Sequence, residues 1–106
     1  MTVTLRLVPR FEKFPGELMT QSVDFDAVMA AGESISSASA TAVQKDTGTD
    51  VTGSVISGSA TFAGTLVTYR VTGGTAGSNY VLTVRATLNT GDIYEQRLEM
   101  SVVSYP

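Results

Sequence analysis

The side chains that could do acid–base chemistry here are carboxylates, because the chain contains no His, Cys or Trp. The candidate pairs are Asp24 with Asp26 and Glu95 with Glu99. General acid–base catalysis needs two such groups at a defined separation, with a pKa shifted by burial. Both glutamates alternate with Arg97 on the outer face of an expected strand, which favours a solvated ladder of charges. We interpret the two aspartates as helix capping.

A second candidate is the polar loop that contains Asp46, Thr49 and Asp50, since hard cations such as Ca²⁺ bind carboxylate and carbonyl oxygens. The loop lacks the final Glu and the central glycine of the familiar calcium loop, so we expect an ordinary surface loop, and calcium binding there stays open. The segment 73–77 (Gly-Gly-Thr-Ala-Gly) is no phosphate cradle, because it has no Lys and precedes a strand. We therefore predict no catalytic, cofactor-binding or metal-binding residue.

The four tyrosines could stack on sugars, which would suit a carbohydrate-binding module. Three of them, Tyr69, Tyr80 and Tyr94, fall on the core-facing side of expected strands. Only Tyr105 is left for such a role. Carbohydrate binding is thus weakly supported.

The elements that must position these residues are clearest in the last third of the chain. Segments 66–72, 80–88 and 94–102 alternate with a period of two, as half-buried strands do. The positions expected to face inward are Val67, Tyr69, Val71, Tyr80, Leu82, Val84, Ala86, Leu88, Tyr94, Gln96, Leu98, Met100 and Val102. A loop of Asn89, Thr90 and Gly91, with its glycine left-handed, predicts that Arg85 lies opposite Glu95 and Leu82 opposite Leu98.

Toward the N-terminus, Val3, Leu5 and Leu7 predict a first strand, and Pro9 is expected to stop it because it has no N–H to give a ladder. A tight turn at Pro15-Gly16 should follow. Residues 18–25 then predict a second strand, with Met19, Gln21, Val23 and Phe25 sharing a face.

The middle of the chain is less regular. Residues 26–32 predict one or two helical turns, with Asp26 as N-cap and Gly32 as left-handed terminator. Residues 34–43 are rich in Ser and Ala and are best explained as a thin strand, because a linker there would separate the strands on either side. Short strands are expected at 51–52, 55–56 and 60–62. The sheet order of residues 36–59 is not determined by the sequence.

These elements predict an all-β fold: an antiparallel immunoglobulin-like β-sandwich of about seven strands with one short helical turn, a barrel being the alternative. The 106 residues and 42% hydrophobic content suit one domain, residues 1–106. Tyr80, after a glycine-rich corner, resembles the tyrosine corner of such sandwiches, in which the hydroxyl bonds to backbone upstream. The alternative for Tyr80 is a partly exposed strand residue.

Charge and hydropathy argue against some classes of partner and location. A net charge of −3 and seven scattered basic residues argue against a nucleic-acid surface. No stretch has the length and apolarity of a membrane span. Residues 1–7 alternate like a strand and lack the basic and apolar regions of a leader, so we expect no secretion signal. Without cysteine, the redox compartment stays undetermined.

Four motifs together resemble a known family. They are residues 15–17 (Pro-Gly-Glu), 23–25 (Val-Asp-Phe), 73–80 (Gly-Gly-Thr-Ala-Gly-Ser-Asn-Tyr) and the Thr90-Gly91 hairpin before Glu95. In this order they are similar to the small immunoglobulin-like virion proteins of tailed bacteriophages and prophages, in particular the fibre-tail adaptors. The similarity runs from about Phe11 to Val103 and rests on turn and core signatures. Residues 36–59 do not align with it.

The resemblance implies a non-enzymatic virion part, made in the host bacterial cytoplasm, that joins a tail or connector to a fibre or a neighbouring virion protein. It implies partners among virion proteins, a homo-oligomeric ring in the particle and a monomer in isolation, and it offers no catalytic or ligand-binding residues. The competing class is an adhesion or carbohydrate-binding module of a bacterial surface protein. The identity of the partner, the copy number and the place in the particle are not determined by the sequence.

Overall fold

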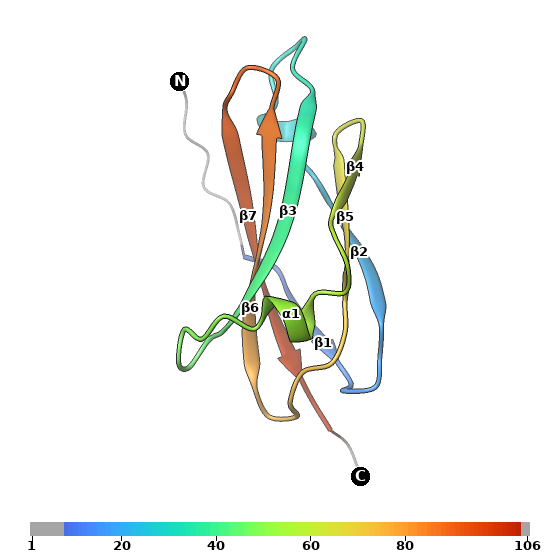
Figure 1. Cartoon of the computed structure of the whole chain (residues 1–106), viewed down its shortest axis with the longest axis vertical. Helices are drawn as coiled ribbons and strands as arrows, with labels where there is room; N and C mark the ends of the chain where they lie inside the picture. Colours follow the sequence, from blue (N-terminus) through green and yellow to red (C-terminus); the bar gives the residue numbers. More distant parts are fainter. Residues whose placement is uncertain (1–7, 105–106) are drawn as a thin grey trace.

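The computed structural model describes residues 8–104, which form two β-sheets packed face to face (Figure 1). The elements follow in the order β1 (Arg10–Lys13), β2 (Met19–Asp24), the 3-10 helix η1 (Asp26–Val28), β3 (Ile35–Gln44), α1 (Thr52–Val55), β4 (Thr61–Ala63), β5 (Leu66–Val71), β6 (Asn79–Leu88) and β7 (Ile93–Val102). The predicted all-β immunoglobulin-like sandwich of about seven strands is confirmed. There are two short helices where one helical turn was expected.

One sheet has the strand order β1-β7-β6-β3 and the other β2-β5-β4. The residues that the sequence left without a sheet order are now placed, because β3 pairs with β6 and β4 with β5. Every named pair is antiparallel except β1 with β7, which is parallel. The predicted antiparallel sandwich therefore has one parallel pair, at this edge.

Strand β1 was not predicted, because Pro9 was expected to end strand formation. Proline has no N–H, but its carbonyl still accepts a hydrogen bond, and Pro9 O accepts one from Glu99 N at 2.9 Å. The chain can thus enter a parallel edge strand directly after the proline. The strand predicted from Val3, Leu5 and Leu7 lies outside the described residues.

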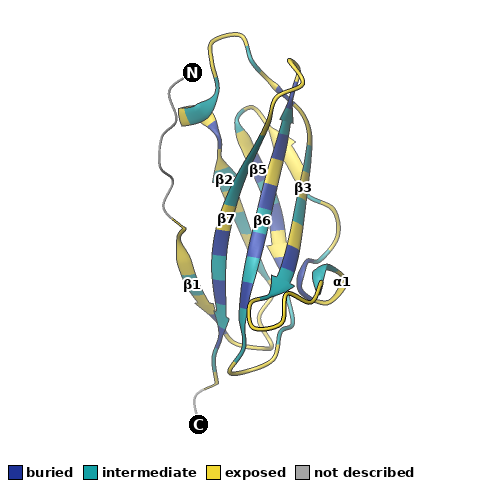
Figure 2. Ribbon diagram, turned by 90° about the vertical axis from the view of Figure 1, so that its left-hand side faces the viewer, coloured by how far each residue is buried: buried dark blue, intermediate teal, exposed yellow. Residues whose placement is uncertain are grey.

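The core lies between the sheets, and β6 contributes most to it, as the alternating dark bands along this strand show (Figure 2). The predicted inward faces of β5 and β6 are confirmed in full, with Val67, Tyr69, Val71, Tyr80, Leu82, Val84, Ala86 and Leu88 all buried. On β7 the prediction holds for Leu98, Met100 and Val102. Tyr94 and Gln96, in the first half of β7, are only half-buried.

The β6–β7 hairpin has the predicted register. Gly91 has a φ of 91°, and Leu88 N donates to Asp92 O at 2.8 Å. Arg85 lies opposite Glu95 and Leu82 opposite Leu98. A short loop with one left-handed glycine thus aligns ten-residue strands along their whole length.

The turn at Pro15-Gly16 is confirmed, since Glu17 N donates to Phe14 O at 3.0 Å across it. Strand β2 also forms as predicted, with Gln21 on its inward side. The polar amide is explained by Tyr69, whose hydroxyl donates to Gln21 Oε1 at 3.1 Å. Burial raises the pKa of Tyr69 to about 12, so the phenol stays a donor at neutral pH.

Two local predictions in the middle of the chain are wrong. Residues 51–52 and 55–56 were expected to be strands, but Thr52–Val55 forms α1, which begins where the Asp50 carboxylate accepts from the backbone N–H of Thr52. The N-cap position of η1 is Phe25, not Asp26. The predicted thin strand β3 and the strand at 60–62, observed as β4, are confirmed. Gly32 is left-handed, with a φ of 84°.

Within residues 8–104, no helix has the length and apolarity needed to cross a membrane.

Candidate interaction surfaces

The carboxylates Glu95 and Glu99 lie on the outer face of β7, where each forms ion pairs. Glu95 contacts Arg85 at 2.6 Å and Arg97 at 3.9 Å. Glu99 contacts Lys45 at 3.0 Å and Arg10 at 3.4 Å. The ladder of charges predicted for this face is present.

The electrostatics of Glu99 do not suit a catalytic acid. A hydrogen bond from Lys45, together with the charges of Arg10 and Lys45, lowers the pKa of Glu99, against a smaller desolvation effect. A general acid needs a raised pKa so that it stays protonated near neutral pH. The pairs instead tie the end of β3 and the start of β1 to β7.

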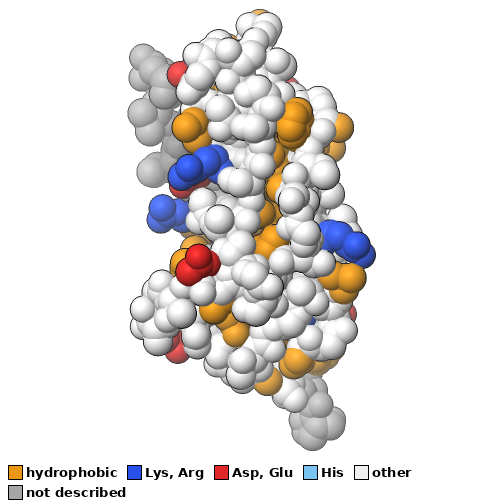
Figure 3. Space-filling model, viewed as in Figure 1, with side chains coloured by type: hydrophobic (Ala, Val, Ile, Leu, Met, Phe, Trp, Pro, Cys, Tyr) orange, Lys and Arg blue, Asp and Glu red, His pale blue; other side chains and the backbone are white. Residues whose placement is uncertain are grey.

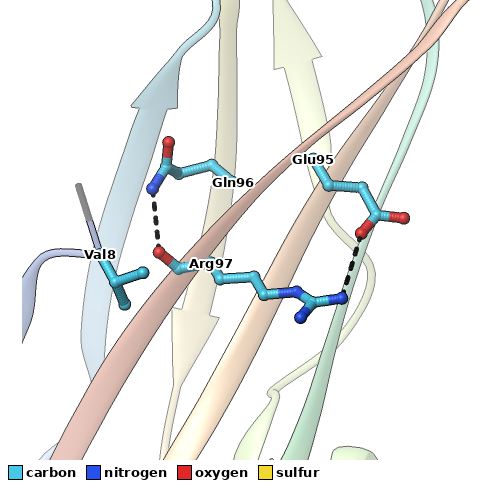
Figure 4. A pocket seen from close by; sticks show the side chains of 4 residues that line it. All are labelled: Val8, Glu95, Gln96 and Arg97. Carbon is cyan, nitrogen blue, oxygen red and sulfur yellow. Dashed lines mark hydrogen bonds and ion pairs between the residues drawn. The ribbon is translucent and has the colours of Figure 1, made fainter. Parts of the chain in front are cut away.

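A shallow hollow of about 300 Å³ lies beside this ladder, lined by Val8, Glu95, Gln96 and Arg97 (Figure 4). The Gln96 amide donates to the backbone carbonyl of Arg97 at 2.9 Å, and the Arg97 guanidinium points to Glu95. The polar groups that line the hollow thus bind one another. The arrangement does not place a nucleophile beside a base.

The second candidate pair, Asp24 and Asp26, has a structural role at the end of β2. Asp24 Oδ1 accepts from the Thr65 hydroxyl at 2.7 Å and from Asp26 N at 2.9 Å. These two bonds lower the pKa of Asp24 and keep it ionised. The two aspartates were expected to cap the helix; the N-cap position is Phe25, and Asp24 instead accepts from the backbone N–H of Asp26, the first residue of η1.

In the polar loop after β3, Asp50 is also occupied by local contacts. Its Oδ1 accepts from the hydroxyl and the backbone N–H of Thr52, at 2.7 and 2.9 Å, which lowers its pKa. The hydroxyls of Thr47 and Thr49 lie 2.7 Å apart. Within the part of the chain that the structure describes, no three His, Cys, Asp or Glu side chains are grouped to hold a metal ion. The calcium hypothesis gains no support from this loop.

The glycine-rich segment 73–77 forms the predicted tyrosine corner. Tyr80 is buried, and its hydroxyl accepts a hydrogen bond from Thr75 N at 2.9 Å. A Cβ at Gly73 would meet Ser54 O at 2.8 Å, and one at Gly74 would meet Val102 Cγ2 at 2.6 Å. The glycines are required for close packing at this corner.

Sequence reasoning missed Lys13, which is 1% exposed. Its Nζ donates to the carbonyls of Gly73 at 2.7 Å, Phe14 at 2.8 Å and Pro15 at 3.3 Å. Desolvation lowers its pKa, while the charge of Glu17 opposes the shift. Lys13 thus joins the turn at Pro15-Gly16 to the tyrosine corner. Its position two residues after the half-buried Phe11 is the one local signal that it faces inward.

The sheet edges are the remaining surfaces. The strands β1 and β3 bound one sheet, and β2 and β4 the other. On one side β3 and β4 lie in contact, and we call this the β3–β4 side, residues 36–41 and 60–63. Figure 3 looks onto it: apolar side chains line up between the two strands, uncharged atoms surround them, and charged side chains stand toward the left and right margins.

The β3–β4 side is apolar and uncharged because of the side chains of these two strands. Strand β3 carries no charge over ten residues, and its inward alanines Ala38 and Ala40 are small and only partly buried against the core. Phe62 lies opposite the buried Val67, so it points inward, yet it is 42% exposed. Within residues 8–104, this apolar line between two open edges is a surface suited to binding another polypeptide.

Comparison with known families gives one match. The family model described as "Podophage GP4 fiber-tail adaptor protein gp77" matches residues 13–101. No curated protein matches the chain.

Proposed function

Because this chain belongs to the podophage fibre-tail adaptor family, we propose that it is a non-enzymatic structural component of a tailed-phage or prophage virion. In this role it joins the tail or connector to a fibre or a neighbouring virion protein. The match over residues 13–101 is the observation that carries the proposal. It includes all strands from β2 to β6 and most of β7.

The geometry supports a binding role. Of the candidate carboxylates, Glu99 and Glu95 form ion pairs, and Asp24 and Asp50 accept local hydrogen bonds. We therefore propose that the chain has no catalytic, cofactor-binding or metal-binding residue. Elemental analysis of the purified protein should find no stoichiometric zinc or iron, and either metal at one equivalent would contradict this.

The proposal extends to location and assembly. The protein is made in the host cytoplasm and ends in the particle, in several copies arranged around the tail. Contacts repeated around a ring can each be weak and still hold the assembly together. The isolated sandwich, a single domain, is then a monomer that assembles on its partner.

The test is the protein content of purified virions. Mass spectrometry should detect the chain in intact particles, and electron microscopy should place it between the tail and a fibre or connector protein. The control is a phage with the gene deleted, whose particles should lack the density and the attached component. A protein that is expressed during infection yet absent from intact particles would overturn the adaptor role.

A further inference from the structure

The outer edge of β3, on the β3–β4 side, has unpaired backbone groups within the described residues. Ala42 directs its groups away from β6: its N–H donates to Thr52 Oγ1 at 3.0 Å and its carbonyl accepts from Val51 N at 3.0 Å. Residues at alternate positions of an antiparallel strand direct their N–H and C=O groups to the same side. Ala38 and Ala40 therefore also direct theirs away from β6.

These outward groups have no partner among residues 8–104. Beyond the ladder to β6, the structure gives no hydrogen bond to the backbone of Ala38 or Ala40. An unpaired row of this kind is a template for another strand, and proteins usually protect it with Lys, Pro or a covering loop. Residues 36–41 contain no charge and no proline. A covering segment is present, but it reaches only Ala42 and Gln44, where Val51 and Thr49 pair with the strand.

We propose that the β3 edge receives a single extended segment of another virion protein, which adds a fifth strand beside Ala38 and Ala40. The inference rests on the proposed adaptor function and names its contact. The segment alternates apolar and uncharged polar side chains. Its inward side chains cover the exposed part of Phe62 and the partly buried Ala38 and Ala40. Its outward side chains continue the Ser and Thr face of β3.

A second copy of the chain fits this edge poorly. Antiparallel pairing of two β3 strands about Ser39 would place Ser36 of one copy opposite Ala42 of the other. That position is already taken by Val51 and Thr52, which hydrogen-bond to Ala42. Stable interfaces between whole domains bury roughly 1,200 Å² or more. The unpaired stretch of β3 is short for an interface of that size. A narrow segment that ends before Ala42 meets neither difficulty.

The first test removes the outward donor. Ala40→Pro deletes an N–H that β6 does not use, so the ladder to β6 is kept. Thr20→Pro in the edge strand β2 is the matched control. The N–H of Phe25 bonds to Thr65 O on the side of β5, so odd-numbered residues of β2 direct their N–H groups to β5 and even-numbered ones, such as Thr20, direct theirs to the free edge. We expect about tenfold less Ala40→Pro than wild type per purified particle, the effect of one lost hydrogen bond with its partner unsatisfied, and wild-type amounts of Thr20→Pro. Equal incorporation of both variants overturns the inference.

The second test needs no proline and so does not depend on how that variant folds. Hydrogen–deuterium exchange of the β3 peptide is measured in the free protein and in intact virions. Protection gained in the particle by residues 38–41, and not by β2, supports strand addition. Unchanged exchange in β3 overturns it, while presence of the wild-type chain in the particle leaves the adaptor role standing.

The third test identifies the occupant. The native chain has no cysteine, so Ser39→Cys carries a photo-cross-linker at one position. We expect a cross-link to one segment of a different virion protein. A cross-link to β3 of a second copy, or none in particles that contain the variant, overturns the proposal.

Discussion

Strands β3 and β6 are paired in one sheet and have the same length of ten residues, yet they contribute very differently to the core. In β6 every second residue from Tyr80 to Leu88 is buried. In β3 only Ile35 and Ala42 are buried. Strand β6 lies between two neighbours and β3 at an edge. Side-chain size thus distinguishes a strand that builds the core from one that contributes little to it.

The difference has an energetic side. Burying a Leu or Val side chain contributes about 1.5 to 3 kcal/mol, and the alanines of β3 contribute far less. Strand β3 is therefore held mainly by its ladder to β6 and by Thr52 at one end. Four substitutions, ordered by expected effect, test this contrast.

The largest effect is expected for Leu82→Ala in β6. Leu82 is fully buried, so the substitution removes apolar contacts and leaves a cavity, and should cost about 2 to 5 kcal/mol of unfolding free energy. Urea denaturation measures it. Thr83→Ala, on the other face of β6, is the control and should change stability much less. Similar losses for both would mean that β6 does not centre the core.

Tyr80→Phe should cost about 1 kcal/mol, because it removes the hydrogen bond that the buried tyrosine hydroxyl accepts from the backbone N–H of the exposed Thr75. The ring and its packing stay, so the change isolates the hydroxyl. The denaturation midpoint should fall while the slope is kept. An unchanged midpoint would contradict a stabilising tyrosine corner.

Glu99 links both edges of its sheet to β7, and its effect should depend on pH. Its pKa is lowered in the folded state, so its contribution is present above the ordinary glutamate pKa and is lost as the pH falls through the lowered value. The stability gap between wild type and Glu99→Gln should therefore narrow below roughly pH 4. It should also narrow at high salt, which screens exposed pairs. A gap independent of pH would refute the assignment.

The smallest effect is expected for Ser39→Val in β3. Ser39 is exposed and lies opposite Arg85, so the larger side chain should change stability by no more than about 0.5 kcal/mol in either direction. Thermal or urea denaturation would show it. A larger loss of unfolding free energy would mean that folding requires small side chains in β3.

The sequence by itself determined the elements whose information is local. The period of two in β5, β6 and β7 gives their inward faces, since neighbouring side chains of a strand point to opposite faces. The β6–β7 register follows from a short loop with a left-handed Gly91. The glycine-rich segment before Tyr80 was enough to predict the tyrosine corner, because its hydrogen bond spans five residues.

Only the tertiary structure decided what depends on distant partners. Strand β1 forms by parallel pairing with β7, which lies far along the chain. Lys13 can be buried because its ammonium group donates a hydrogen bond to the carbonyl of Gly73, sixty residues away. Segment 52–55 is a helix whose first residue, Thr52, accepts a hydrogen bond from Ala42 at the edge of β3, ten residues earlier in the chain. The open edge at Ala38 and Ala40 has the same origin. A strand's own residues show that it can pair, but which of its sides stays unpaired is set by the order of the strands in the sheet.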